Sequence, residues 1–133
     1  MKKFLLLTLS ALFLTACSEE KKQFEQAVLE QMQNDQDIQD YNLDPERITR
    51  CIVDLVSKKI PGVFFFDPET RSYYVGYRKL ISVKLGEDPQ QTLLELHEIF
   101  GSAKATMQAQ MNYSQSELTC ITSLVTETEE DAQ

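Results

Sequence analysis

Three similar tripeptides divide the middle of this chain and restrict its secondary structure. They are Asp44-Pro45-Glu46, Asp67-Pro68-Glu69 and Asp88-Pro89-Gln90. An aspartate before a helix accepts hydrogen bonds from the free backbone amides of the first turn. Proline fits the first helical position because the amide hydrogen that it lacks is not needed there. Each tripeptide therefore predicts the start of a helix, provided that helical periodicity follows it.

The segments after these tripeptides carry apolar residues at the spacing of an amphipathic helix. The three patterns end at Pro61-Gly62, Gly86 and Gly101, so we expect one helix in each segment. The apolar positions are Ile48, Cys51, Ile52, Leu55 and Val56, then Tyr73, Tyr74, Tyr77, Leu80, Ile81 and Leu85, then Leu93, Leu94, Leu96, His97 and Phe100. Phe64-Phe65-Phe66 is too short to need a sheet partner, and we expect a buried connector there.

The C-terminal region predicts one long helix that begins at Ser102. An apolar stripe recurs along it at alternating steps of four and three residues, and we expect this stripe to face the core. Its members are Met107, Met111, Ser114, Leu118, Ile121 and Val125. Ser114-x-x-Glu117 also resembles a capping box, which would allow a break near Tyr113. We favour the unbroken helix.

The remaining segments give weaker patterns. Residues 23–33 carry apolar side chains at helical spacing and predict a first helix. Residues 34–42 are polar and acidic, so we expect a frayed extension or a linker. Residues 126–133 contain four acidic side chains, and we expect a disordered tail. No segment alternates like a strand. The sequence therefore predicts an all-α domain over residues 23–125, a small bundle of four or five helices.

The first 16 residues have the organisation of a secretion signal. Lys2 and Lys3 form a basic start, and an apolar run follows from Phe4 to Leu14. A membrane span needs about 20 apolar residues, so this run is too short to remain as one. We expect residues 1–16 to be cleaved from the mature protein.

The residues Leu14-Thr15-Ala16-Cys17 resemble the lipobox of bacterial lipoprotein precursors. The resemblance implies cleavage before Cys17, a diacylglycerol on its sulfur and acylation, typically by palmitate, of its amino group. Several acyl chains anchor a protein firmly, where one chain binds only marginally. Residues 17–22 would then form a lipidated tether. Ser18 is not the aspartate that favours the inner membrane in enterobacteria, so the resemblance implies the outer membrane, facing the periplasm. The alternative is an ordinary cleaved signal with a chance cysteine.

Two further cysteines, Cys51 and Cys120, form an even pair in a chain with an export signal. The periplasm is oxidising, so we expect a disulfide between them. Both begin the pattern Cys-Ile-x-x-Leu-Val, which places each cysteine on the apolar face of its own helix. The shared pattern fits either an old repeat or similar packing demands. Two buried free thiols are the main alternative, and the spacing does not favour a redox or metal site.

The composition argues against several classes of function. The formal charge is -8, and it becomes -10 when Lys2 and Lys3 are removed with the signal, so nucleic acid is a poor candidate partner. His97 is the single histidine and lies among apolar residues of its helix, which indicates a core or boundary position. Residues 34–40 lack the glycine of a calcium loop. We therefore expect no catalytic residue, no metal and no cofactor.

Tyr73, Tyr74 and Tyr77 are the candidate partner-binding residues, together with Arg78. On one helix the three tyrosines span more than a single face, so we expect at least one ring to be partly exposed, and tyrosine is common at interaction hot spots. The alternative is that these tyrosines are ordinary core and boundary residues.

The sequence favours a non-enzymatic function. The leading hypothesis is a lipid-anchored helical domain that binds an unknown protein partner in the periplasm, as an envelope accessory or an immunity-type inhibitor. The alternative hypothesis is a periplasmic carrier or sensor for a small apolar ligand held within the bundle. A hydrolase acting on the cell wall has no supporting residues.

Overall fold

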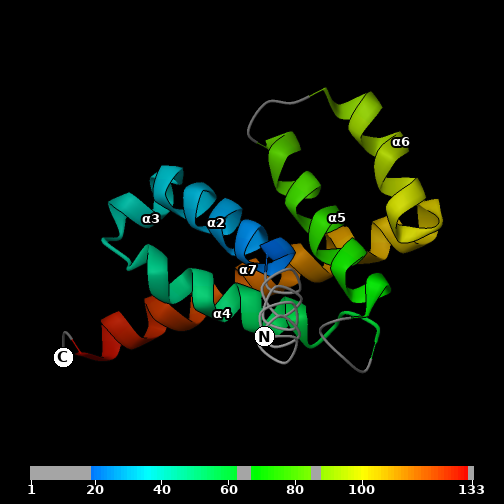
Figure 1. The fold of residues 1–133 in the computed structure, drawn as a ribbon. Helices are drawn as coiled ribbons and strands as arrows, with labels where there is room; N and C mark the ends of the chain where they lie inside the picture. The colour runs from blue at the N-terminus through cyan, green and yellow to red at the C-terminus, as the bar shows by residue number, and fades with distance from the viewer. Residues whose placement is uncertain (1–18, 63–66, 85–87, 132–133) are drawn as a thin grey trace, which may run out of the picture.

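The structure of the protein is a computed structural model that describes residues 19–62, 67–84 and 88–131. Over these residues the chain forms six helices and no strand (Figure 1). The helices are α2 (Glu19–Asn34), α3 (Gln36–Asp40), α4 (Pro45–Ser57), α5 (Pro68–Lys84), α6 (Pro89–Phe100) and α7 (Ala103–Asp131). The all-α prediction is confirmed. The predicted number of four or five helices is too low, because the short α3 was not expected.

The three predicted helix starts are confirmed. Each aspartate accepts a hydrogen bond from the backbone amide two residues later, at 3.0 Å for Asp44, 3.1 Å for Asp67 and 2.9 Å for Asp88. A proline is the first residue of α4, α5 and α6. The local chemistry of an acceptor followed by a residue without an amide hydrogen therefore determines where these helices begin.

The short helix α3 corrects the prediction of a linker over residues 34–42. The carboxylate of Asp35 accepts hydrogen bonds from the amides of Asp37 and Ile38 and starts the helix. Ile38 and Leu43, which look isolated in the sequence, are both buried in the core. Burial of these two side chains stabilises a single helical turn that would be marginal alone.

The C-terminal helix α7 is unbroken, as predicted. It continues to Asp131, whereas we expected disorder from residue 126. Glutamate is a good helix former, and Glu127 lies 2.8 Å from the guanidinium of Arg47 on α4. This ion pair is half-exposed, so it adds little stability, and the extension follows mainly from continuation of a helix already formed.

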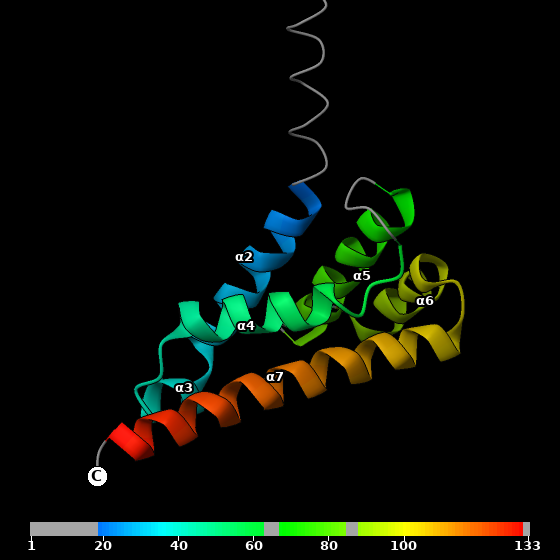
Figure 2. The ribbon, with the colours of Figure 1, turned by 90° about the horizontal axis from the view of Figure 1, so that it is seen from below.

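The helices pack around α2 and α7. Helix α2 contacts α4 and α5, α6 packs on α5, and α7 contacts both α4 and α6. Figure 2 shows α7 running along one side of the bundle beneath α4 and α6. The first turn of α2 lies on the opposite side of the bundle from α7 in the same view. Helix α7 therefore lies on the side of the bundle away from the end at which the described chain begins.

Aromatic rings from four helices form the centre of the core. Phe24 of α2 and Phe100 of α6 each have their ring centroid 5.7 Å from that of Tyr77 on α5, and Tyr113 of α7 joins the same cluster. Gly76 allows α5 and α6 to approach closely, since a Cβ atom there would lie 2.5 Å from Cζ of Phe100. A hydrogen in place of a side chain is therefore required by the packing.

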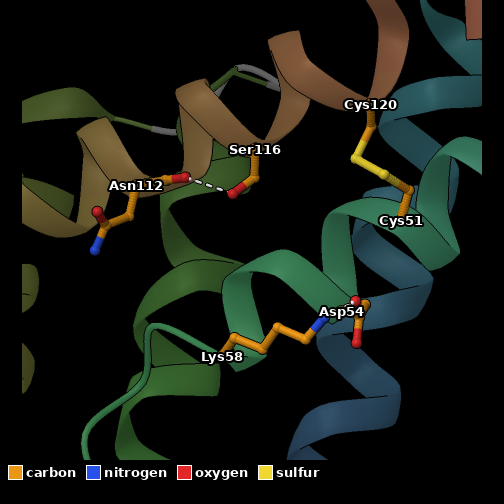
Figure 3. Close-up of a disulfide and its surroundings, with 6 residues drawn as sticks. All are labelled: Cys51, Asp54, Lys58, Asn112, Ser116 and Cys120. Carbon is orange, nitrogen blue, oxygen red and sulfur yellow. Dashed lines mark hydrogen bonds and ion pairs between the residues drawn. A yellow bond between two sulfur atoms is a disulfide. The ribbon is translucent and has the colours of Figure 1, made fainter. Parts of the chain in front are cut away.

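A disulfide joins Cys51 of α4 to Cys120 of α7, with 5.8 Å between their Cα atoms (Figure 3). Cys120 is fully buried, as expected, whereas Cys51 is only partly buried at the edge of the core. The bond links residues 69 positions apart in the sequence. It fixes the rotation of α7 about its own axis at the point where α7 crosses α4.

Three sequence predictions lie outside the described residues. They concern the cleaved signal over residues 1–16, the lipid attachment at Cys17 and the buried connector Phe64-Phe65-Phe66.

Candidate functional site

The predicted tyrosine patch is not an exposed surface. Tyr77 is fully buried, Tyr74 is almost so, and Tyr73 is half-buried against the core. The hydroxyl of Tyr74 donates a hydrogen bond to the Ser57 hydroxyl at 2.9 Å. Arg78 donates to the side chain of Gln23 on α2. Tyr74 and Tyr77 are therefore core residues, which was the alternative interpretation, and Tyr73 is the ring that remains partly exposed. The hydrogen bonds of Tyr74 and Arg78 hold α5 against α4 and α2.

The buried tyrosines keep their phenolic protons and serve a structural role. Burial raises the pKa of Tyr77 and of Tyr113 above the usual range for phenols. The Tyr113 hydroxyl donates to Oε1 of Gln31 at 2.8 Å, and Nε2 of Gln31 donates to Glu117 at 2.6 Å. This chain of hydrogen bonds satisfies a polar group deep in the core and joins α2 to α7.

Three further observations concern the described residues. His97 is half-buried near the end of α6. Within residues 19–62, 67–84 and 88–131, no group of three or more histidine, cysteine or acidic side chains is placed to hold a metal ion. Among the helices that the structure describes, none is both long and apolar enough to cross a membrane.

Helix α7 faces the core with a different side from the one predicted. The buried residues are Thr106, Ala109, Tyr113, Ser116, Cys120 and Leu124. Tyr113 enters the aromatic cluster and Cys120 forms the disulfide, so these two residues set the rotation of the helix. Thr106 donates to the backbone carbonyl of Ser102, just before the helix, and Ser116 donates to that of Asn112 within it, so burial of their hydroxyls leaves no donor unpaired.

The apolar stripe that was expected in the core lies instead on the outer face of α7. We call these residues the outer stripe, and its members are Met107, Met111, Ser114, Leu118, Ile121 and Val125. Met107 is 63% exposed, Met111 48% and Leu118 67%, while Ile121 and Val125 are partly covered. The prediction that this stripe is buried is wrong for its exposed members.

Helix α6 exposes two further apolar side chains. Leu93 is 48% exposed and Leu94 is 67% exposed. Leu93 lies beside the outer stripe, since it lines the same cavity as Ser114 of α7. Large exposed apolar side chains that gather on neighbouring helices are typical of interaction surfaces. We therefore treat α6 and α7 together as the candidate docking face.

A cavity of about 250 Å³ opens beside this face, between α5, α6 and α7. Its lining is mainly apolar. The lining residues are Leu80, Val83, Pro89, Leu93, Leu96, Gln110, Tyr113 and Ser114. Because an apolar cavity of about 150 Å³ already admits a benzene-sized molecule, this one has room for an apolar side chain or a small ring.

The docking face is also distinguished by its charge. Residues 105–126 of α7 contain one charged residue, Glu117, whereas 26% of the whole chain is charged and the formal charge is -8. Glu117 is half-buried and accepts from Gln31, so it belongs to the inner side of the helix. The exposed apolar side chains of α7 therefore lie on a neutral strip of an acidic protein.

Comparison of the chain with protein-family models, with curated proteins and with solved structures finds no match.

Proposed function

We propose that this protein is an exported lipoprotein, anchored through Cys17 to the outer membrane and facing the periplasm, whose helical domain binds a protein partner. In this proposal the protein is not an enzyme and acts as an accessory of an envelope assembly or as an immunity-type inhibitor. The observation that carries the binding function is the exposure of Leu94 on α6 and of Met107 and Leu118 on the neutral strip of α7. Exposed apolar surface gains free energy when a partner covers it.

The position of the anchor supports an accessible docking face. Helix α2 begins at Glu19, only two residues after Cys17, so lipidation there would hold the first turn of α2 next to the membrane. Helix α7 runs along the opposite side of the bundle in Figure 2. The helix that carries the outer stripe would then lie away from the lipid, where a partner in the periplasm can reach it.

The anchor is tested by metabolic labelling with palmitate. We expect the wild-type chain to incorporate the label and Cys17→Ala to lose it, because the thiol is the acceptor of the diacylglyceryl group. Cys51→Ala is the matched control, since it removes another cysteine and should retain the label. Continued labelling of Cys17→Ala would contradict the lipoprotein proposal.

The docking face is tested by oxidation of methionine with peroxide in intact cells. Met107 and Met111 should be oxidised more slowly in cells than in the purified, diluted protein, because a partner covers them in the envelope. Met32, which is fully buried, serves as the internal control and should be slow in both samples. Equal oxidation rates of Met107 and Met111 in cells and in dilution would refute docking at this face.

The cavity between α5, α6 and α7 supports a second candidate function, binding of a small apolar ligand. Its volume of about 250 Å³ lies below the range of about 300–1,000 Å³ that is common for ligand pockets, so only a small molecule would fit. Mass spectrometry of the protein purified from membranes tests this candidate. A bound apolar compound that Leu96→Phe displaces would favour it over a protein partner.

A further inference from the structure

We propose that the partner of the outer stripe is a second copy of this chain, with two α7 helices packed antiparallel. This inference rests on the docking function proposed above and names its partner. Four properties of α7 support this occupant: the spacing of the outer stripe, its symmetry, the charge of the strip, and the cavity beside Ser114. Met107, Met111 and Leu118 are exposed, and Ile121 and Val125, which also pack against the core, are partly exposed.

The spacing of the outer stripe fits a helical partner. Its members alternate at steps of four and three residues from Met107 to Val125, which averages one apolar position in about 3.5 residues, as in a coiled-coil seam. A stripe of this period stays in contact with a second helix that supercoils around the first. A flat partner surface would need no such period.

The order of the side chains fits an antiparallel pair of identical helices. With a two-fold axis at the level of residue 116, Met107 faces Val125 of the second copy, Met111 faces Ile121, and Ser114 faces Leu118. The last contact places the smallest member of the stripe opposite an exposed leucine. Small residues opposite large ones allow two helices to interdigitate, and this occurs twice in the symmetric pair.

The charge of the strip permits self-association where the rest of the surface opposes it. Two copies with a formal charge of -8 each repel one another in general. The positions that flank the stripe on α7 include Gln108, Gln110, Gln115 and Thr122, and all four are uncharged and exposed. In coiled coils such flanking positions carry the charges that select or reject a partner. The one charged flanking residue, Glu117, accepts a hydrogen bond from Gln31 of its own copy and would face Gln115 of the second copy, so no two like charges face each other along the stripe.

The cavity supplies a place for the leucine of the second copy. Ser114 and Gln110 of α7 and Leu93 of α6, all three exposed, are among the residues that line it. Leu118 of the second copy, which faces Ser114, would direct its side chain towards this opening. Leu118 of one copy is therefore the knob, and the cavity beside Ser114 of the other copy is the hole. The two-fold axis brings them together.

The size of the contact predicts a weak dimer that depends on anchoring. A stripe of this length spans roughly 28 Å of helix, and a single pair of helices covers less than the roughly 800 Å² per partner of a standard interface. Attachment of both copies to one membrane raises their effective concentration and compensates for weak affinity. We therefore expect association in the membrane and dissociation on dilution.

The test is photo-crosslinking of the full-length, membrane-anchored protein in intact cells, with benzoylphenylalanine at position 111. The expected product is two copies of the chain joined between position 111 and the peptide that contains Ile121. The matched control carries the same group at Thr119, an exposed position on another side of α7, and should give no such product. A link from position 111 of one copy to position 111 of the other would indicate a parallel pair and overturn the proposal.

A pair of lysine variants tests the knob and the hole. Leu118→Lys should reduce the crosslinked product by about tenfold or more, because an unpaired ammonium group would face an apolar cavity. Thr119→Lys adds the same charge outside the stripe and should leave the product unchanged. Both positions are exposed, so neither variant should impair folding.

The possible outcomes separate this inference from the proposed function. A product that contains only a different protein, lost in Leu118→Lys, would overturn self-association and leave docking at this face intact. The absence of any product from position 111, together with equal methionine oxidation in cells and in dilution, would overturn both. A dimer that is unaffected by Leu118→Lys would overturn the antiparallel arrangement.

Discussion

Reduction of the disulfide between Cys51 and Cys120 should cost a large part of the stability of this domain. The bond joins residues 69 positions apart, and closing a loop of that length lowers the entropy of the unfolded chain by an amount worth roughly 4 kcal/mol. A small domain has a net stability of about 5–15 kcal/mol. Removing the bond therefore brings the protein close to the limit of folding at physiological temperature.

The assay is equilibrium urea denaturation followed by far-ultraviolet circular dichroism, with and without a thiol reductant. The free energy of unfolding falls by about 1–3 kcal/mol for each molar of urea. Loss of roughly 4 kcal/mol of stability therefore lowers the urea concentration at the unfolding midpoint by roughly 2 M. The variant with Cys51→Ala and Cys120→Ala is the control, and reductant should not move its midpoint.

A midpoint that reductant leaves unchanged in the wild-type protein would refute the reasoning. A loss of less than about 1 kcal/mol would show that the unfolded chain is already restricted without the bond, since entropy of the unfolded state is the assumed source of the effect.

Two further predictions concern packing and pH. Gly76→Ala should lower the melting temperature by several degrees, because the new Cβ atom would lie 2.5 Å from the Phe100 ring. Overpacking of this kind costs about 1–3 kcal/mol, which exceeds the roughly 1 kcal/mol that alanine gains in helix propensity. A higher melting temperature would contradict the packing. The Arg71 guanidinium lowers the pKa of Glu20, so the stability from this pair is present above the ordinary glutamate pKa and is lost as pH falls through the lowered one. Arg71→Gln should therefore make acid unfolding less dependent on pH, and an unchanged profile in thermal scans from pH 6 to pH 3 would argue against the pair.

The helix starts and the disulfide could be predicted from the sequence because their causes are local or few. An aspartate followed by proline determines the first turn of α4, α5 and α6 without help from distant residues. Only one pairing was available to Cys51 and Cys120 once Cys17 was assigned to lipid. Helix α3 was missed because its stability comes from Ile38, whose burial depends on packing that a short polar segment does not reveal.

The rotation of α7 could not be predicted from apolar periodicity, since two of its faces carry apolar residues. The outer stripe has the stronger pattern, and the face that is buried includes Thr106, Ala109 and Ser116. A usable signal was nonetheless present: Tyr113 and Cys120 are seven residues apart and share a face. The predicted disulfide required that face to turn inward, and this would have placed Met107 and Leu118 outside.

The tyrosines of α5 illustrate the limit of composition as a guide to binding sites. Tyrosine is common both at interfaces and in cores, and Tyr73, Tyr74 and Tyr77 follow the same helical spacing in either case. The choice depends on what packs against them, which here is Phe24 of α2 and Phe100 of α6. The sequence alone does not reveal which residues of other helices pack against these tyrosines.

Native mass spectrometry of the full-length protein, extracted from membranes in a mild detergent, tests the account most directly. We predict a chain that begins at Cys17 and carries the added mass of a diacylglyceryl group and an acyl chain. An unmodified chain with the mass of all 133 residues, 15.3 kDa, would contradict the anchor.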